Sequence, residues 1–351
     1  MKPARRPRRR RTPSADPRMA VFTEVPRAEA AALVERLGLG ALTALEGCAS
    51  GIENTNYFCD TERGRYVLTL FERLTAEQLP FYLHLMKHLA ERGIPVPGPQ
   101  ADAAGEILHR VRGKPAAVVD RLRGSHRLAP DAAHCAPVGA MLARMHLAAA
   151  DYPRVQPNLR GLAWWIETAP LVLPFLDAGQ RELIEGELRF QRQLAASSAC
   201  AMLPRGPIHA DLFRDNVMFD DTPAGDRLSG FFDFYFAGVD ALLFDVAVCL
   251  NDWCIDLESG RLAEDRAVAF VDAYDAVRPL ASAERRLLPA MMRGAALRFW
   301  ISRLWDLHLP RDASMLTAHD PAHFEHVLRE RVRSPWHPTP AAAGDDDATA
   351  P

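Results

Sequence analysis

The chain has 351 residues, 48% of them hydrophobic and 25% charged, with a formal net charge of −3 at pH 7. This length predicts about two domains or lobes, and the composition is typical of a globular protein with enough apolar side chains for a core. The longest apolar run, residues 231–250, contains Asp233, Asp240 and Asp245, which excludes it as a membrane-spanning helix of roughly 18 or more apolar residues.

The cysteines and the N-terminal stretch predict a cytoplasmic protein. Six cysteines are scattered along the chain, with no CxxC pair and no cluster with histidines at the spacing of a zinc site. In a chain of this size such thiols are typically reduced. The basic N-terminal stretch is not followed by the apolar segment that a secretory signal would contain.

Both ends of the chain are predicted to be disordered tails. Residues 1–18 hold eight basic side chains and one acidic side chain, so they carry +7 and the rest of the chain carries −10. A like-charged segment that is poor in apolar residues cannot bury enough surface to fold. We favour a non-structural extension over an arm for nucleic acid or a membrane surface. A protein that starts at Met19 is one explanation for it, and the sequence leaves open whether residues 1–18 belong to the native protein. Residues 336–351, rich in Pro, Ala and Asp, are predicted to be a tail as well.

The first third of the folded region is predicted to be rich in short strands. Runs bounded by Gly, Pro or charged residues predict strands at residues 42–48, 55–60, 66–71, 106–110 and 116–122. One helix is predicted between them, at residues 76–92, because apolar residues recur there at helical spacing and Gly93 ends the pattern. We assign residues 19–122 to an N-terminal lobe.

From residue 131 onward the pattern becomes mainly helical. Helices are predicted at residues 131–150, 160–176, 177–197, 263–277 and 282–308. The segment 207–245 lies between them and contains strand-like pieces at 216–219 and 228–234. The expected fold class is therefore α+β and bilobal, with an antiparallel sheet in the N-terminal lobe and a mostly helical lobe over residues 123–335.

The mixed segment contains a pattern typical of phosphoryl transfer. Residues 208–219 read I-H-A-D-L-F-R-D-N-V-M-F, in which His209, Asp211 and Asn216 form the pattern HxDxxxxN. An apolar strand follows and leads to Asp233, 17 residues after the asparagine. This order matches a phosphotransferase catalytic loop. The alternative is a chance polar loop beside a buried strand, which Asp233 at this distance makes the weaker interpretation.

Each of these residue types suits one task in phosphoryl transfer. A carboxylate is needed to accept the proton of the attacking hydroxyl, and Asp211 fits that role. Mg2+ prefers oxygen ligands, so the side chains of Asn216 and Asp233 are the predicted metal ligands. His209 is predicted to brace the loop through hydrogen bonds rather than to take part in the chemistry.

The segment resembles the aminoglycoside-phosphotransferase-like kinases, small-molecule kinases with a protein-kinase-like fold. The homoserine kinase branch of that family is similar to this chain at residues 50–58, 66–72, 93–97, 113–116, 142–148 and 297–304. The resemblance covers about residues 19–335. It implies ATP and Mg2+ as cofactors, L-homoserine as the acceptor, and a step of threonine biosynthesis that yields O-phospho-L-homoserine. It also implies that Asp245 is a buried, structural aspartate that caps the backbone of the catalytic loop.

The nucleotide-binding part of the resemblance contains one departure. The loop after the first strand is the expected phosphate-covering loop, with Ser50, Gly51, Asn54 and Asn56 as candidate nucleotide contacts; a plain hairpin turn is the alternative. Kinases of this fold carry a lysine on the third strand, and Thr69 stands at that position here. Another cation, such as Arg65 or Arg73, would have to replace it.

The acceptor site is the least defined part of the sequence-based prediction. A homoserine site needs an arginine for the α-carboxylate and an acidic group for the α-ammonium. Arg298 and Arg303 on the helix at 282–308 are the candidates. The alternative is that both form structural ion pairs with Asp240, Asp245 or Asp252. Trp164 and Trp165 are interpreted as core residues in preference to walls of a pocket.

Two further functions stay open from the sequence alone. The same fold acts on other acceptors, such as an aminoglycoside, choline or methylthioribose. A non-catalytic nucleotide-binding or nucleic-acid-binding protein is favoured only by Thr69 and the basic tail. We expect no nucleic-acid partner and no membrane partner, and the sequence leaves the oligomeric state open.

Overall fold

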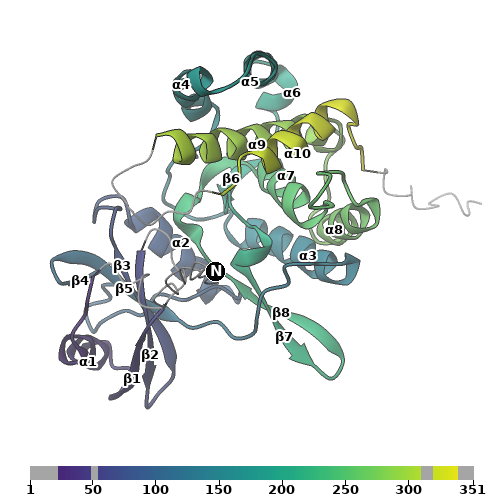
Figure 1. Cartoon of the computed structure of the whole chain (residues 1–351). Helices are drawn as coiled ribbons and strands as arrows, with labels where there is room; N and C mark the ends of the chain where they lie inside the picture. Colours follow the sequence, from purple (N-terminus) through teal and green to yellow (C-terminus); the bar gives the residue numbers. More distant parts are fainter. Residues whose placement is uncertain (1–22, 49–53, 310–318, 339–351) are drawn as a thin grey trace, which may run out of the picture. The chain divides into compact units, whose positions relative to one another are not determined.

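The computed structural model describes residues 23–48, 54–309 and 319–338 (Figure 1). The chain forms two compact units, Met1–Gln78 with Gln100–Arg121 and Leu79–Pro99 with Leu122–Pro351. The predicted lobe boundary lies at residue 122, and the second unit additionally includes residues 79–99. The predicted tail at 1–18 and most of the one at 336–351 lie outside the described residues.

The first unit contains a five-stranded antiparallel sheet with strand order β1-β2-β3-β5-β4. Its elements are α1 (Arg27–Arg36), β1 (Leu42–Gly47), β2 (Asn54–Thr61), β3 (Arg65–Phe71), β4 (His109–Val111) and β5 (Lys114–Asp120). Predicted strands overlap all five, which confirms the sheet, although β4 begins three residues after the start of the predicted strand 106–110. Helix α1 was not predicted.

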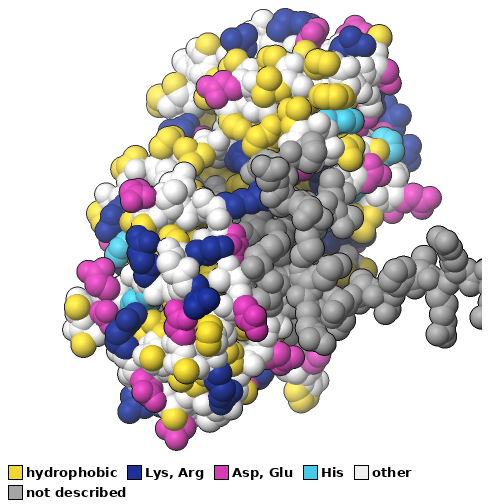
Figure 2. Space-filling view, turned by 60° about the vertical axis from the view of Figure 1, so that its left-hand side comes forward, with side chains coloured by type: hydrophobic (Ala, Val, Ile, Leu, Met, Phe, Trp, Pro, Cys, Tyr) yellow, Lys and Arg dark blue, Asp and Glu magenta, His cyan; other side chains and the backbone are white. Residues whose placement is uncertain are grey.

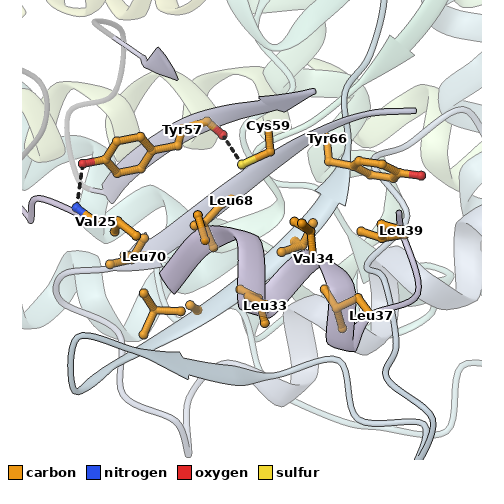
Figure 3. Close-up of a cluster of buried hydrophobic side chains, with 14 residues drawn as sticks. Val25, Leu33, Val34, Leu37, Leu39, Tyr57, Cys59, Tyr66, Leu68 and Leu70 are labelled. Atoms are coloured by element: carbon orange, nitrogen blue, oxygen red, sulfur yellow. Dashed lines mark hydrogen bonds between the residues drawn. The ribbon is translucent and has the colours of Figure 1, made fainter. Parts of the chain in front are cut away.

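Helix α1 covers one face of this sheet and closes its core (Figure 3). Side chains alternate between the two faces of a strand, so every second residue of β2, β3 and β5 points toward α1. The buried cluster includes Leu33 and Val34 of the helix, Tyr57 and Cys59 of β2, and Leu68, Leu70, Ala116 and Val118 of β3 and β5. Thr69 lies on the other face of β3.

The second unit is mostly helical. Its helices are α2 (Pro80–Glu91), α3 (Ala132–Ala148), α4 (Leu162–Val172), α5 (Ala178–Ala195), α6 (Ser198–Ala201), α7 (Leu242–Trp253), α8 (Glu264–Val277), α9 (Ser282–His308) and α10 (Ala322–Arg333). Two antiparallel ribbons interrupt them, β6 (Arg205–Ile208) with β9 (Gly238–Ala241), and β7 (Val217–Thr222) with β8 (Gly225–Phe231). None of the helices described has both the length and the apolar character that a membrane crossing requires.

The helices of the second unit pack around α7 and α9. Helix α9 packs against α4, α5, α7 and α10, and α3 packs against α8. All residues of α7 are buried, including Asp245, Asn251 and Asp252. Buried polar groups need hydrogen-bond partners. The two buried aspartates of α7 therefore indicate that polar backbone groups of the chain lie beside this helix.

The charges on the face shown in Figure 2 are mixed in sign. Lys and Arg side chains alternate with Asp and Glu side chains over the described part of this face, and hydrophobic side chains lie among them. Such a mixed surface is ordinary for a globular protein.

Candidate active site

The predicted catalytic residues lie where the two ribbons of the second unit end. Asp211 follows β6, and a 3-10 turn, Arg214–Asn216, leads from it into β7. The side-chain amide of Asn216 donates from Nδ2 to the backbone carbonyl of Asp211 at 2.8 Å. The backbone carbonyl of Asn216 accepts from the N–H of Phe232 at 3.0 Å, which places the chain before Asp233 beside it. The structure thus brings Asp211, Asn216 and the segment carrying Asp233 together.

The chain that leads to Asp233 is held by a close approach to Pro95. The N–H of Phe231 donates to the carbonyl of Pro95 at 3.0 Å. A Cβ atom on Gly230 would lie 2.5 Å from the same carbonyl oxygen, so only glycine allows the two segments to meet. Asp233 itself has φ 68° and ψ 58°, a left-handed conformation that costs a non-glycine residue about 1 kcal/mol. The surrounding contacts therefore fix an unfavourable backbone at a predicted metal ligand.

Asp245 holds the beginning of the catalytic loop. Its side chain is fully buried in the first turn of α7. Oδ2 accepts from the N–H of His209 at 2.7 Å and Oδ1 accepts from the N–H of Ala210 at 2.6 Å. Ala210 has φ 63°, another left-handed residue, and the two hydrogen bonds stabilise it there. The resemblance to kinases implied this contact, and the structure contains it.

Asp252, at the other end of α7, holds the far side of the same loop. Its Oδ2 accepts from the backbone N–H of Arg214 at 2.8 Å, and its carboxylate pairs with the guanidinium of that arginine. Both groups are nearly buried. Helix α7 therefore fixes the loop at two points through two carboxylates. The sequence analysis assigned a role to Asp245 and missed this role of Asp252, which no local pattern reveals.

His209 braces the loop in its neutral form. Its Nε2–H donates to the carbonyl of Phe232 at 2.9 Å, and Nδ1 accepts from the N–H of Asp211 at 3.3 Å. One nitrogen donates and the other accepts, which is the arrangement of a neutral imidazole. Burial lowers the pKa of His209, in agreement with this state. The side chain therefore links Asp211 to the segment before Asp233.

Asp211 is a carboxylate with one fixed partner and an unusual pKa. Its side chain is 16% exposed, and Nη1 of Arg298 donates to its Oδ1 at 3.3 Å. Burial raises the pKa of Asp211 well above its ordinary value, the nearby charge of Asp233 raises it further, and Arg298 opposes both. A raised pKa makes a carboxylate a better proton acceptor at neutral pH than an ordinary surface aspartate.

Arg298 is the buried partner of this carboxylate. It is 2% exposed, its guanidinium lies 3.8 Å from the ring centre of Phe299, and its Nε is buried without a hydrogen-bond partner among the described residues. Burial lowers the pKa of Arg298 to about 10, while Asp211 opposes this change. The arginine therefore stays charged at neutral pH and supplies the positive charge beside Asp211.

Arg303 occupies a different position from Arg298. Its Nη1 donates to the carbonyl of Asp320 at 3.3 Å, and its guanidinium lies 4.4 Å from the ring centre of Phe324. Neither Arg298 nor Arg303 forms an ion pair with Asp240, Asp245 or Asp252, which the structural alternative had predicted. The carboxylates proposed for it have other partners: Asp240 contacts Arg205, Asp245 contacts His146, and Asp252 contacts Arg214. The predicted structural ion pairs with these three aspartates are therefore wrong.

Arg298→Met is expected to move the acid limb of the pH profile to higher pH. Asp211 must be ionised to accept a proton, and Arg298 is the group that lowers its pKa. Without that charge, burial and Asp233 remain, so the pKa of Asp211 rises further and activity is lost at a higher pH as the solution is acidified. The profile of kcat/KM for the acceptor measures this, with Arg205→Met, at a more exposed ion pair, as the control. An unchanged acid limb would contradict the pairing.

The predicted metal ligands offer hard oxygen atoms. Asn216 uses its Nδ2 on the Asp211 carbonyl, which directs Oδ1 to the opposite side of the amide. Among the residues described, no group of three or more His, Cys, Asp or Glu side chains is arranged for a metal ion. Mg2+ is ordinarily held by one or two carboxylates or amides and completes its shell with phosphate oxygens and water. Asn216 and Asp233 match that kind of site.

The predicted nucleotide residues are only partly within the described chain. Ser50 and Gly51 lie outside it, whereas Asn54 and Asn56 are in β2. Thr69, at the position where a lysine is expected, donates from Oγ1 to Oδ1 of Asn56 at 2.8 Å. It is buried and carries no charge. At this position of the third strand, an uncharged threonine that bonds to Asn56 therefore takes the place of the expected lysine.

A partly exposed ion pair between Lys114 and Glu72 lies in the first unit and was not predicted. Lys114 Nζ contacts Glu72, whose other carboxylate oxygen accepts from the hydroxyl of Thr55 at 2.6 Å. Burial raises the pKa of Glu72, but these hydrogen bonds outweigh it and hold the pKa below its usual value. Strand alternation puts Lys114 on the same face as Ala116 and Val118, which pack on α1. Lys114 is therefore on the face opposite Thr69 and is not a direct substitute for the missing lysine.

A cluster of aromatic rings around Arg160 is the other feature that the sequence analysis missed. The guanidinium of Arg160 lies 4.4 Å from the ring centre of Trp164, 5.1 Å from that of Trp305 and 5.9 Å from that of Phe236. Trp165 is buried, as predicted, and Trp164 is only partly buried. We call Arg160, Trp164, Trp305 and Phe236 the arginine–aromatic cluster.

Comparisons with known proteins show the family of this chain. The sequence model of the family described as "Phosphotransferase enzyme family" matches residues 44–280. A protein of Polaromonas naphthalenivorans (strain CJ2) named homoserine kinase is 67% identical over 91% of this chain and 99% of its own length. A homoserine kinase of Janthinobacterium sp. (strain Marseille) is 55% identical over 93% of this chain and 100% of its own.

The solved structures show the fold. An amicoumacin kinase in complex with AMP-PNP and Ca2+ is similar, with a TM-score of 0.60 and 16% identity, over 86% of this chain and 92% of that chain. At this identity the likeness supports the fold alone. It confirms the predicted α+β architecture, an antiparallel sheet followed by a mostly helical part.

Proposed function

Because this chain belongs to the phosphotransferase enzyme family, we propose that it is a homoserine kinase, which transfers the γ-phosphoryl group of ATP to the 4-hydroxyl of L-homoserine and yields O-phospho-L-homoserine. The observation that carries the proposal is the 67% identity to a homoserine kinase over 91% of this chain. The geometry supports the reaction class independently, since Asp211 is a partly buried carboxylate on a braced loop. The product would serve threonine biosynthesis.

Asp211 is the group that we assign to the acceptor hydroxyl. Its Oδ1 is held by Arg298, which leaves Oδ2 to accept the hydroxyl proton. As that proton moves to Asp211, the hydroxyl oxygen forms a bond to the γ-phosphorus, and the bond from this phosphorus to the bridging oxygen breaks to release ADP. Positioning of the hydroxyl supplies much of the catalysis in such transfers. His209, Asp245 and Asp252 act on the reaction through the loop that they hold.

Asn216 and Asp233 are the residues that we propose for Mg2+. The donor set fits the ion, because an amide oxygen and a carboxylate are both hard ligands, and the Asn216 amide is oriented by its bond to the Asp211 carbonyl. When bound, Mg2+ neutralises the negative charge of the nucleotide phosphates. Ser50, Gly51, Asn54 and Asn56 stay predictions for nucleotide contacts, and a cytoplasmic location stays a prediction too.

An acceptor panel tests the proposal. Purified protein is incubated with ATP and Mg2+, and ADP release is followed with L-homoserine, L-serine, L-threonine, choline, methylthioribose and kanamycin. We expect selective turnover of L-homoserine that a chelator abolishes. Preference for another acceptor would keep the reaction class and overturn the substrate. ATP binding without turnover of any of them would instead favour a non-catalytic nucleotide-binding protein.

A further inference from the structure

A cavity in the second unit lies apart from the candidate active site. It has a volume of about 300 Å³, and residues of α4, α5, α6 and the ribbon of β6 and β9 line it (Figure 1). Ligand pockets have volumes of about 300 to 1,000 Å³, so this one suits a small molecule. The described residues that line it include none of Asp211, Asn216, Asp233 and Arg298, and no member of the arginine–aromatic cluster.

The register of the β6–β9 ribbon separates the cavity from the catalytic loop. Arg205 pairs with Ala241, and both residues line the cavity, whereas Ile208 pairs with Gly238 at the other end of the ribbon. The loop that carries Asp211 begins after Ile208. Three steps along a strand span about 10 Å, so the cavity and the loop are at opposite ends of the same ribbon.

Two opposite charges lie side by side at this cavity. Nη2 of Arg205 donates to Oδ1 of Asp240 at 3.0 Å, and the two side chains are 53% and 23% exposed. Among the residues that the structure describes, Asp240 is the one hydrogen-bond partner of Arg205, so Nε and Nη1 can bind a further group. The same carboxylate accepts from the N–H of Ala241 at 2.8 Å and from Nδ2 of Asn158 at 3.0 Å. A carboxylate has about four acceptor positions, so one position remains for another donor.

The N-terminus of α4 adds a second positive feature to the same cavity. Gly161, Leu162 and Ala163 line the cavity, and no side chain of the described residues caps this end of the helix. The first N–H groups of a helix have no partner within it and carry partial positive charge, which favours a carboxylate nearby. A Cβ atom on Gly161 would lie 3.6 Å from Oδ2 of Asp240, so the helix begins in close contact with the ion pair.

The remainder of the lining is mainly apolar. The larger apolar side chains that line the cavity are Leu162, Trp165, Leu194, Val239, Phe244 and Met291. The rings of Trp165 and Phe244 contact each other, with their centres 6.1 Å apart, and both side chains are buried. An apolar group that leaves water for such a surface is stabilised. The cavity therefore combines an apolar interior with one positive and one negative group.

We propose that this cavity binds a free α-amino acid with an apolar side chain. The α-carboxylate bonds to Arg205 and the N-terminus of α4, the α-ammonium bonds to Asp240, and the side chain occupies the apolar interior. A free amino acid carries both charges on one carbon atom, so it needs opposite charges side by side, as in this ion pair. A peptide carries these charges on different residues and does not match. The site does not depend on which acceptor the protein phosphorylates.

Calorimetry with L-leucine and two analogues tests the recognition of both charges. The analogue 3-methylbutylamine lacks the carboxylate, and 4-methylpentanoate lacks the ammonium. We expect each to bind the wild-type protein at least about tenfold more weakly than L-leucine, because one charge-assisted contact is lost. Arg205→Met should weaken L-leucine by about tenfold or more and leave 3-methylbutylamine within about twofold. Arg227→Met, at the exposed pair with Asp220, is the matched control and should change neither affinity.

Alkylation of Cys200 tests where the ligand binds. Cys200 lines the cavity and is the one cysteine of the described residues that is not buried. L-leucine at ten times its dissociation constant should slow the reaction of Cys200 with N-ethylmaleimide about tenfold, by mass action, as followed by peptide mass spectrometry. Ala163→Trp places a large ring at an exposed position of the lining and should abolish both the binding and the protection.

Three results would overturn the proposal. They are a wild-type protein that does not bind L-leucine at millimolar concentration, binding that Arg205→Met leaves unchanged, and binding that does not protect Cys200. Unchanged kinetics of Arg205→Met with L-homoserine, together with weakened binding of L-leucine, would support a site separate from that of the acceptor. Neither the calorimetry nor the alkylation involves turnover, so failure of the proposed function is detected separately by the acceptor panel.

Discussion

Asp211→Asn is expected to lower kcat on L-homoserine by about 1,000-fold while ATP binding stays within about twofold of the wild type. The asparagine keeps the size of the side chain and can still accept from Arg298, but it cannot take up a proton. Its backbone contacts to His209 and Asn216 do not depend on the carboxylate. The loss therefore falls on the transfer step, which steady-state kinetics and a nucleotide-binding titration measure separately.

Asp220→Asn is the matched control for this variant. Asp220 lies on β7, a few residues beyond the catalytic loop, and pairs with the exposed Arg227. We expect its kcat to stay within about twofold of the wild type, because surface ion pairs contribute little. A kcat for Asp211→Asn above about a tenth of the wild-type value would contradict the assignment of the base, since general-base contributions are ordinarily about 100-fold or more.

Asp245→Ala is expected to lower the free energy of unfolding by about 3 to 5 kcal/mol and to abolish most of the activity. The substitution leaves the N–H groups of His209 and Ala210 buried without their acceptor. It also removes one of the two partners of His146, whose Nε2 lies 3.1 Å from the Asp245 carboxylate and whose Nδ1 bonds to the hydroxyl of Tyr274. Ala210 would lose the contacts that hold its left-handed backbone, so the loop that carries Asp211 would relax.

Denaturant titration followed by kinetics at low temperature measures both effects of Asp245→Ala. Asp151→Ala is the control, because Asp151 is 68% exposed and pairs with Arg92 at the surface. Its loss should stay below about 1 kcal/mol. A loss of similar size for the two variants would mean that the hydrogen bonds to the loop contribute no more than a surface pair, and the role of α7 in holding the loop would be wrong.

The sequence predicted most regular elements because their signals are local. Strands β1, β2 and β3 follow from short runs with turn residues on both sides, and α9 matches its predicted range of 282–308. Helix α7 was not predicted. It is buried on all sides, so it has no polar face, and a helix of this kind cannot be told from a buried strand by its periodicity.

The candidate site shows the same division between local and long-range information. Asp211, Asn216 and Asp233 were found because one loop and one hairpin carry them in a fixed order. The positions of Arg298 and Arg160 depend on α9 and the segment before α4 meeting at Phe236, which no spacing within one segment encodes. The Lys114–Glu72 pair, which joins the start of β5 to the residue after β3, was missed for the same reason.

The identity of the phosphorylated product tests the central claim most directly. The protein is incubated with Mg2+, L-homoserine and ATP that carries 18O in its γ-phosphoryl group, and the product is analysed by mass spectrometry and 31P NMR. We expect a phosphate monoester on the 4-hydroxyl of L-homoserine that contains the labelled phosphoryl group, and none with Asp211→Asn on the same time scale. A label that appears only in inorganic phosphate, or on a different acceptor from a mixture, would contradict the account.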